Sequence, residues 1–342
     1  MNKPLILVTG STGKTATIAS IILLITVALP LVAQEQRDLR GPEGFIPPPV
    51  HPAGVELETK PLAPGVYALL STKPLVDNSG FIVGERGVLV IDAHINGEMA
   101  GKIQAAVRHV TDKPILYLVN TNYHGDHTFG NYAFPDATLV VAHRETAERM
   151  RNFEEEQQFL LPTVNNDPTV YADARLRLPD VVFDDYLRLD LGGREVELYH
   201  FGHGNTPGDT VIYVPEARVA WTGNLVVGEG TIPFLLEGKP RAYLQTIARF
   251  AETLAVERII PGHGAPSSGR ILGRYLSYLS ELLQSVQDAV QAGRSLEQTL
   301  AGLPLEEKYR PQANAGLEQF DRFLAGFHRW NVQKTYLEFD RR

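Results

Sequence analysis

From about residue 65 to residue 266, short apolar runs alternate with polar, turn-forming residues. Short runs rich in β-branched and aromatic residues alternate with glycine, asparagine or aspartate. Such runs predict β-strands joined by turns. Residues 97–110 and 241–254 instead carry apolar residues three and four positions apart, which predicts amphipathic helices. The strands and helices follow no regular βαβ order, so we predict a mixed α/β protein with two sheets.

The N-terminal pattern differs, because residues 18–32 are almost wholly apolar. Lys3 and Lys14 precede this run, which predicts a secretory signal peptide over residues 1–33 and a mature protein that begins near Gln34. A retained membrane anchor is the alternative, although a spanning helix needs about 20 apolar residues. We therefore expect a periplasmic or secreted protein with no stable membrane span after processing.

The remaining pattern divides the chain into three further parts. Residues 34–63 are rich in proline and predict an extended linker. Residues 64–270 form the main domain, and residues 271–342 a C-terminal helical extension. In this extension an apolar stripe begins at Leu272, and Ser295 begins a capping box for a further helix. The extension is a candidate contact for a homo-oligomer.

Composition narrows the classes of function. Hydrophobic residues make up 44% of the chain and charged residues 21%, which is typical of a globular protein with a buried core. A net charge of −8 argues against a nucleic-acid partner, because such proteins carry a basic face. The chain has no cysteine, which excludes disulfides, cysteine-based zinc fingers and a thiol nucleophile. Any metal must therefore be held by His, Asp, Glu or Asn.

Residues 120–131, NTNYHGDHTFGN, carry the strongest chemical signal. His124, Asp126 and His127 fall within four residues on a glycine-containing loop, directly after the predicted strand ILYLV. Imidazole and carboxylate groups are the usual zinc ligands where no thiol is present.

Three later strands also end in glycine-rich turns that carry polar side chains. One turn holds His203 and Asn205, the next holds Asn224, and the last holds His263 in the sequence PGHG. The PGHG turn alone is a weak signal, but the order of the four segments is specific.

Taken together, these segments resemble the metallo-β-lactamase-fold hydrolase superfamily over roughly residues 65–266. That family carries H-x-H-x-D-H, a later His in an H-T-x-G-D-like turn, an Asp or Cys in a T-G-D/C turn, and a final G-H. The resemblance implies a four-layer αββα sandwich with its metal site at one edge of the two sheets. It also implies that Asp92, at the end of GVLVIDA, orients a metal-binding histidine.

Three positions depart from the family pattern. Asn122 stands for the first His of the first motif, Asn205 for the later His, and Asn224 for the bridging Asp. The positions that match are His124, Asp126, His127 and His263. The resemblance therefore implies one intact metal site made by Asp126, His127 and His263. A weakened site is left for His124, with Asn122, Asn205, Asn224 and His203 as candidate substrate or weak metal contacts.

These residues favour an exported, zinc-dependent hydrolase with one zinc ion (Zn2+) per chain. Its zinc-activated water would attack a small carbonyl substrate, namely a lactam, lactone, ester or thioester. Asp126 would bind the metal and orient the nucleophile. His124 would either be a weak ligand or donate a proton to the leaving group. The alternative is a non-catalytic or weakly catalytic binding protein on a decayed hydrolase fold, and a redox enzyme is the least favoured option.

Some side chains near the motifs are expected to be structural only. Phe129 and Tyr132 flank Gly130, so we expect them to belong to the supporting wall of the site and not to its chemistry. Histidines outside the motifs, including His94 and His143, follow no ligand pattern and are expected to serve the fold.

Overall fold

The computed structural model describes residues 41–42, 45, 47–310 and 318–340, all within one compact unit that spans residues 38–342. The predicted signal peptide and its cleavage site lie outside the described residues. No helix in the described ranges is long and apolar enough to cross a membrane.

The first sheet has seven strands in the order β1-β2-β3-β4-β5-β6-β7. Neighbours pair antiparallel from β1 to β4 and parallel from β4 to β7. The strands are β1 (Leu57–Ala63), β2 (Val66–Ser71), β3 (Ser79–Val83), β4 (Val88–Ile91), β5 (Ile115–Val119), β6 (Leu139–His143) and β7 (Val181–Phe183).

The second sheet has six strands in the order β13-β12-β11-β10-β9-β8, and its one parallel pair joins β11 to β12. The strands are β8 (Tyr186–Asp190), β9 (Glu195–Tyr199), β10 (Val211–Val214), β11 (Val219–Gly223), β12 (Arg258–Pro261) and β13 (Ser267–Ser268). Gly192 and Gly193 both have positive φ, which lets the chain turn between β8 and β9.

Eight α-helices connect or flank the strands of the described part. They are α1 (Gly97–Val110), α2 (Gly125–Thr128), α3 (Arg144–Met150), α4 (Phe153–Leu160), α5 (Pro240–Thr253), α6 (Ile271–Gln291), α7 (Leu296–Gly302) and α8 (Glu318–Phe339). Short 3-10 turns lie at Phe129–Ala133, Leu161–Val164, Pro168–Tyr171, Pro215–Ala217 and Glu307–Tyr309. The predicted capping box of α7 is present, because Ser295 and Gln298 bond to each other's backbone.

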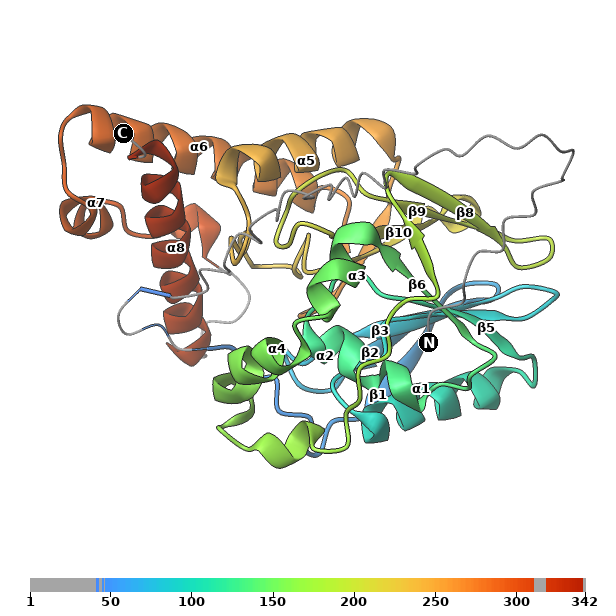
Figure 1. The fold of residues 1–342 in the computed structure, drawn as a ribbon. Helices are drawn as coiled ribbons and strands as arrows, with labels where there is room; N and C mark the ends of the chain where they lie inside the picture. Colours follow the sequence, from blue (N-terminus) through green and yellow to red (C-terminus); the bar gives the residue numbers. More distant parts are fainter. Residues whose placement is uncertain (1–40, 43–44, 46, 311–317, 341–342) are drawn as a thin grey trace, which may run out of the picture. The chain divides into compact units, whose positions relative to one another are not determined.

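Buried side chains show how the layers pack. Ile82 and Leu89 of the first sheet belong to the same core as Ile212 and Trp221 of the second, so the two sheets lie face to face. Helix α1 covers the outer face of the first sheet, with Ile103 in the core below it. Helices α5 and α6 cover the outer face of the second sheet (Figure 1). The predicted αββα sandwich is therefore confirmed.

The structure differs from the sequence prediction at the start of the domain. Residues 57–63, assigned to the linker, form β1 and pair with β2 through an almost continuous register. Edge strands tolerate proline, so Pro61 did not prevent a strand here. Leu57–Ala63 is therefore part of the first sheet, and the linker before it and the division between the main domain and the C-terminal extension stay predictions. Leu272 of α6 and Phe327 of α8 share one buried cluster with residues of the second sheet.

Candidate metal centre and pocket

The first motif forms a tight turn after β5. The side-chain oxygen of Asn122 accepts the backbone N–H of His124 at 2.8 Å, which fixes the loop just before α2. His124 stands at the N-cap of α2, and Asp126 and His127 lie inside this short helix. All four side chains are buried. Asn122 therefore serves the loop itself, where the family pattern has a metal ligand.

The later turns bring their side chains to the same edge of the sheets. Asn224 follows β11 and His263 follows β12, and these strands are parallel neighbours. Glycines allow the close approach. A Cβ on Gly262 would lie 2.7 Å from Cε1 of His127, and one on Gly223 would lie 2.2 Å from Oγ1 of Thr121.

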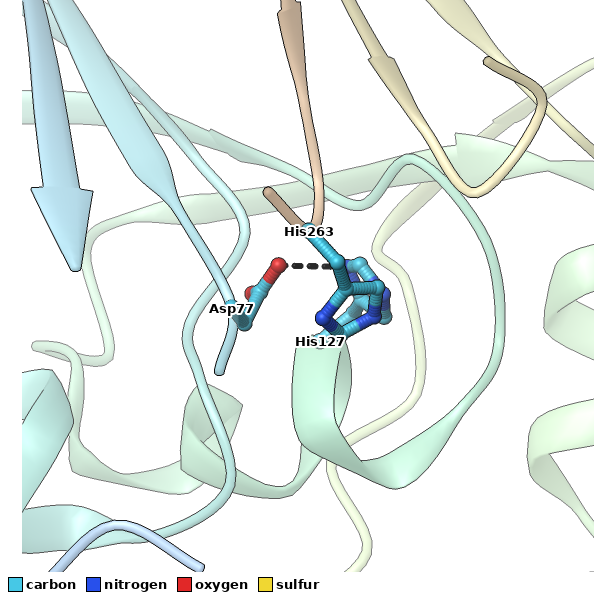
Figure 2. Close-up of side chains that lie close together, drawn as sticks. All are labelled: Asp77, His127 and His263. Carbon is cyan, nitrogen blue, oxygen red and sulfur yellow. Dashed lines mark ion pairs between the residues drawn. The ribbon is translucent and has the colours of Figure 1, made fainter. Parts of the chain in front are cut away.

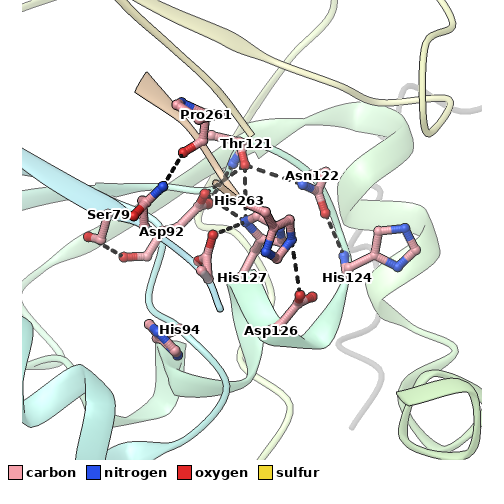
Figure 3. Close-up of polar contacts among 12 residues, drawn as sticks. Ser79, Asp92, His94, Thr121, Asn122, His124, Asp126, His127, Pro261 and His263 are labelled. Atoms are coloured by element: carbon pink, nitrogen blue, oxygen red, sulfur yellow. Dashed lines mark hydrogen bonds and ion pairs between the residues drawn. The ribbon is translucent and has the colours of Figure 1, made fainter. Parts of the chain in front are cut away.

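Asp92 makes the contact that its predicted role requires. Its Oδ2 lies 2.9 Å from Nδ1 of His127, while Thr121 donates its backbone N–H and its hydroxyl to the same carboxylate at 2.8 and 2.6 Å (Figure 3). Asp92 has a φ of 56°, which aspartate and asparagine accept better than most residues. The carboxylate thereby fixes one ring nitrogen of His127 and leaves Nε2 for another partner.

Asp77 is a site residue that the sequence analysis missed. Its Oδ1 lies 3.5 Å from Nδ1 of His127, and both side chains are fully buried (Figure 2). Among the described residues, Asp77, His127 and His263 form the group whose ligand atoms all lie within 4.8 Å of one another. The sequence predicted Asp126, and not Asp77, as the carboxylate of this group. The pairing of β3 with β4 could have indicated Asp77. Asp77 precedes β3 and Asp92 follows β4, and in an antiparallel pair these two positions lie at the same edge of the sheet.

Asp126 lies on the other side of the histidines. Its Oδ2 is 3.3 Å from Nε2 of His263, whose Nδ1 lies 2.8 Å from the carbonyl oxygen of Leu75. Burial alone would raise the pKa of Asp126, but the neighbouring His127, His263 and His124 outweigh it and hold the pKa well below its usual value.

Charge gathers around His127. Burial opposes protonation of its ring, but Asp77, Asp92 and Asp126 raise its pKa well above the usual value. Burial likewise raises the pKa of Asp77. His94 is also buried near this group, and burial lowers its pKa to about 3. No sequence pattern marked His94, because only the tertiary fold brings it near the motif.

His124 has a second unpredicted partner. Its Nδ1 lies 2.9 Å from Oε1 of Glu156 on α4, and Gly125 donates its backbone N–H to the same oxygen at 3.2 Å. Both the His124 and Glu156 side chains are buried, at 2% and 3% exposure. No local sequence pattern marked Glu156, because it is one of three consecutive glutamates on α4.

The remaining predicted residues are placed as follows. Asn205 and Asn224 are buried and line the same cavity as His124, Asp126 and His263. Asn205 donates its amide N–H to the carbonyl oxygen of Phe234 at 2.7 Å. His203 is half-buried and lies outside the residues that line this cavity.

Phe129 and Tyr132 take no part in the lining of this cavity. Phe129 is 2% exposed and packs against Phe153 and Tyr171 at ring distances of 4.8 and 5.5 Å. Tyr132 donates its hydroxyl to Asp173. These contacts are structural. That neither residue takes part in the chemistry stays a prediction.

The donor atoms of the site suit a cation. Nε2 of His124 and His127, Oδ1 of Asn205 and Asn224, and both carboxylate oxygens of Asp77 are buried and have no hydrogen-bond partner among the described residues. Unpaired buried polar atoms are costly, so such a concentration of acceptors indicates a site for a metal ion or a polar ligand.

The family model for the metallo-beta-lactamase superfamily matches residues 72–263, which is more than half of the chain and includes the whole site. The chain belongs to this superfamily. The match begins at residue 72 and ends at His263, so it contains the residues described above.

Two curated proteins and one solved structure are similar to this superfamily member. A linear primary-alkylsulfatase from Pseudomonas sp. (strain ATCC 19151) is 25% identical over 75% of this chain and 54% of its own length. The acyl-coenzyme A thioesterase MBLAC2 from Bos taurus is 27% identical over 51% of this chain and 66% of its own. The structure of the inverting sec-alkylsulfatase Pisa1 from Pseudomonas sp. has a TM-score of 0.63 at 17% identity and covers 83% of this chain and 50% of that one, which bears on the fold alone. The chain thus spans about half to two-thirds of the length of these relatives.

Proposed function

We propose that this protein is a metal-dependent hydrolase that acts on a small carbonyl substrate, namely a lactam, lactone, ester or thioester. The observation that carries the proposal is the set of buried, unpaired donor atoms beside Asp126 and His263, at one end of a cavity. The names of the two curated relatives, a sulfatase and a thioesterase, are those of hydrolases and support this class of reaction.

The metal proposed here is a single zinc ion. Asp126, His127 and His263 would hold it, while Asp77 lies 3.5 Å from Nδ1 of His127 and adds negative charge beside that ring. One carboxylate and two imidazoles form a usual zinc ligand set with a position left open. When bound, the metal would supply Lewis-acid activation of water and of the substrate carbonyl.

Residues of the chain itself would do the remaining work. Asp92 holds His127 in one orientation through the 2.9 Å contact with Nδ1. Asp126 would orient the attacking water through the oxygen that does not contact His263. Asn205 already donates an N–H to Phe234, so Asn224 is the better candidate donor to the developing negative oxygen.

His124 is placed to serve the leaving group. Glu156 holds its Nδ1, while its Nε2 has no partner among the described residues and its side chain lines the cavity. This arrangement suits proton donation when the ring of His124 carries both protons, and weak metal binding when its Nε2 is unprotonated, as at His127.

A binding protein on a decayed fold is the second candidate function. Asn122, Asn205 and Asn224 at former ligand positions favour it, since a neutral amide binds zinc poorly. The retained Asp126, His127 and His263 argue against it.

Metal analysis and a substrate panel separate the two functions. We expect protein purified in zinc to contain close to one metal ion per chain and to hydrolyse at least one lactam, lactone, ester or thioester. Asp126→Ala should remove both properties, while Asp136→Ala, at an exposed position, should keep both. A metal-free protein without turnover would support the binding protein, and two zinc ions at full occupancy would contradict the single site and implicate His203.

Export is a further part of the proposal. It rests on the apolar run at residues 18–32 and the lysines before it. N-terminal sequencing of protein from the native host should find Gln34 at or near the start. An intact Met1 on material from the cytoplasm would contradict export.

A further inference from the structure

The cavity beside the site has two unlike ends. One end carries the polar residues of the site, and the rest is walled by aromatic, aliphatic and proline side chains. Its volume is about 340 Å³, within the range of pockets that bind small molecules. The geometry points to a substrate with a long, apolar acyl or alkyl chain joined to an uncharged ester, thioester or lactone group. This inference rests on the proposed function and adds the substrate class to it.

The apolar wall is built by segments distant in sequence. Phe327 of α8 stacks on Phe234 at a ring distance of 3.9 Å, and Phe45 packs edge-on against Phe327 and Trp330 at 5.0 and 4.7 Å. From the opposite side, Phe159 of α4 lines the cavity and stacks on the ring of His124 at 5.6 Å. The wall thus continues from the site to α8.

The aromatic contacts leave the cavity open between them. Phe327 and Trp330 are each 2% exposed, so their rings are held in place by packing against the protein. Rigid rings around an open space suit an apolar chain, because its burial is favourable and the wall loses little freedom. An apolar chain that enters from the α8 end would present its polar group to Asp126, Asn224 and His263.

The charge of the lining selects the head group. No Lys or Arg side chain lines the cavity in the part of the chain that the structure describes, and Asp126 is a carboxylate. Among the described residues, a carboxylate, sulfate or phosphate next to the reacting group would therefore meet no Lys or Arg side chain. An uncharged ester, thioester or lactone needs none.

Binding without turnover tests the pocket separately from the reaction. Calorimetric titration of the chelator-treated, metal-free protein with hexanol, octanol and decanol uses the apolar chain alone. We expect affinity to rise two- to fourfold per added methylene group until the chain fills the cavity, since each buried methylene contributes about that factor at most. The heat-capacity change of binding should be negative.

A leucine-to-tryptophan substitution inside the cavity can be compared with the same substitution on the surface. Leu236 lines the cavity, so Leu236→Trp should weaken decanol binding at least tenfold and affect hexanol less. Leu139→Trp makes the same change at a side chain that is 41% exposed on β6, and it should bind all three alcohols as the parent does. Circular dichroism and thermal melts of both variants confirm that they fold.

Turnover then tests the head group. With zinc present, KM for p-nitrophenyl butyrate, octanoate and dodecanoate should fall along the series, and Leu236→Trp should abolish that trend. A neutral octanoate ester should react faster than octyl sulfate. Preference for octyl sulfate would overturn the uncharged head group.

The failures of the two proposals are distinguishable. Alcohol binding without hydrolysis of any lactam, lactone, ester or thioester would leave the pocket in place and refute the hydrolase. Hydrolysis with the same KM for every chain length, and no alcohol binding, would keep the hydrolase and refute the apolar-chain substrate.

Discussion

Replacing Asp92 by Asn tests whether the carboxylate behind His127 controls the metal site. Asp92 accepts three contacts, from the backbone and hydroxyl of Thr121 and from Nδ1 of His127, at 2.6 to 2.9 Å. Asparagine keeps the shape and accepts the φ of 56°, so the backbone need not move. Only the charge and one acceptor change.

The expected effect follows from the ring of His127. An amide cannot accept the Nδ1–H of His127 and the hydroxyl of Thr121 as strongly as a carboxylate does, so the ring loses the bond that presents Nε2. Loss of such an outer partner weakens metal binding about 10- to 100-fold, which corresponds to about 1.4–2.8 kcal/mol.

A competition titration of zinc against a fluorescent chelator measures this change in folded protein. Asp136→Asn is the matched control, because its side chain is exposed on the surface, and it should keep the parent affinity. A zinc affinity of Asp92→Asn within twofold of the parent, in protein with an unchanged melting profile, would refute the reasoning.

Three further changes follow from the same geometry. Gly262→Ala would place a Cβ 2.7 Å from Cε1 of His127, so we expect a loss of about 1–3 kcal/mol of stability and weaker zinc binding. Gly101→Ala is the control, because a Cβ there meets nothing within 4 Å, and it should be neutral or stabilising in urea titrations. Asn205→Ala should leave the zinc content near one per chain and change turnover only if Asn205 contacts substrate, so metal loss would mark it as a ligand. Burial and the stacked ring of His200 at 3.8 Å lower the pKa of His143 to about 4 from 6.5, so protonation costs the folded state more than the unfolded one. Stability should therefore fall by about 1–2 kcal/mol as the pH drops from 7 to 5, and His143→Gln should flatten that pH dependence in chemical denaturation.

The sequence predicted the fold well where local pattern and tertiary contacts agree. The helix predicted at residues 97–110 was confirmed with its boundaries. The strand at residues 57–63 was missed, because Pro61 reads as a linker residue and only pairing with β2 makes it a strand.

The candidate site was predictable only where the candidate ligand residues follow strands in close succession. His124, Asp126 and His127 lie within four residues, and the fold brings Asn224 and His263 to them as the resemblance implied. Asp77 is a lone carboxylate before a strand, and its position depends on the register of β3 against β4.

Glu156 was hidden for a different reason. It is the last of three consecutive glutamates on α4, a composition typical of an exposed helix face. Its burial at 3% depends on α4 packing over α2, which no local pattern records. Contacts of this kind become visible only in three dimensions.

The distribution of carboxylates gives a physical reason to expect one cation and not two. Asp77 and Asp92 contact His127, and Asp126 contacts His263, so negative charge gathers around these two histidines. At the other side Asn224 supplies a neutral amide where the family has a bridging carboxylate. A second dication about 3.5–4 Å away would meet repulsion that this amide cannot offset. A site with charge on one side and amides on the other therefore favours a single metal beside a pocket that accepts uncharged groups.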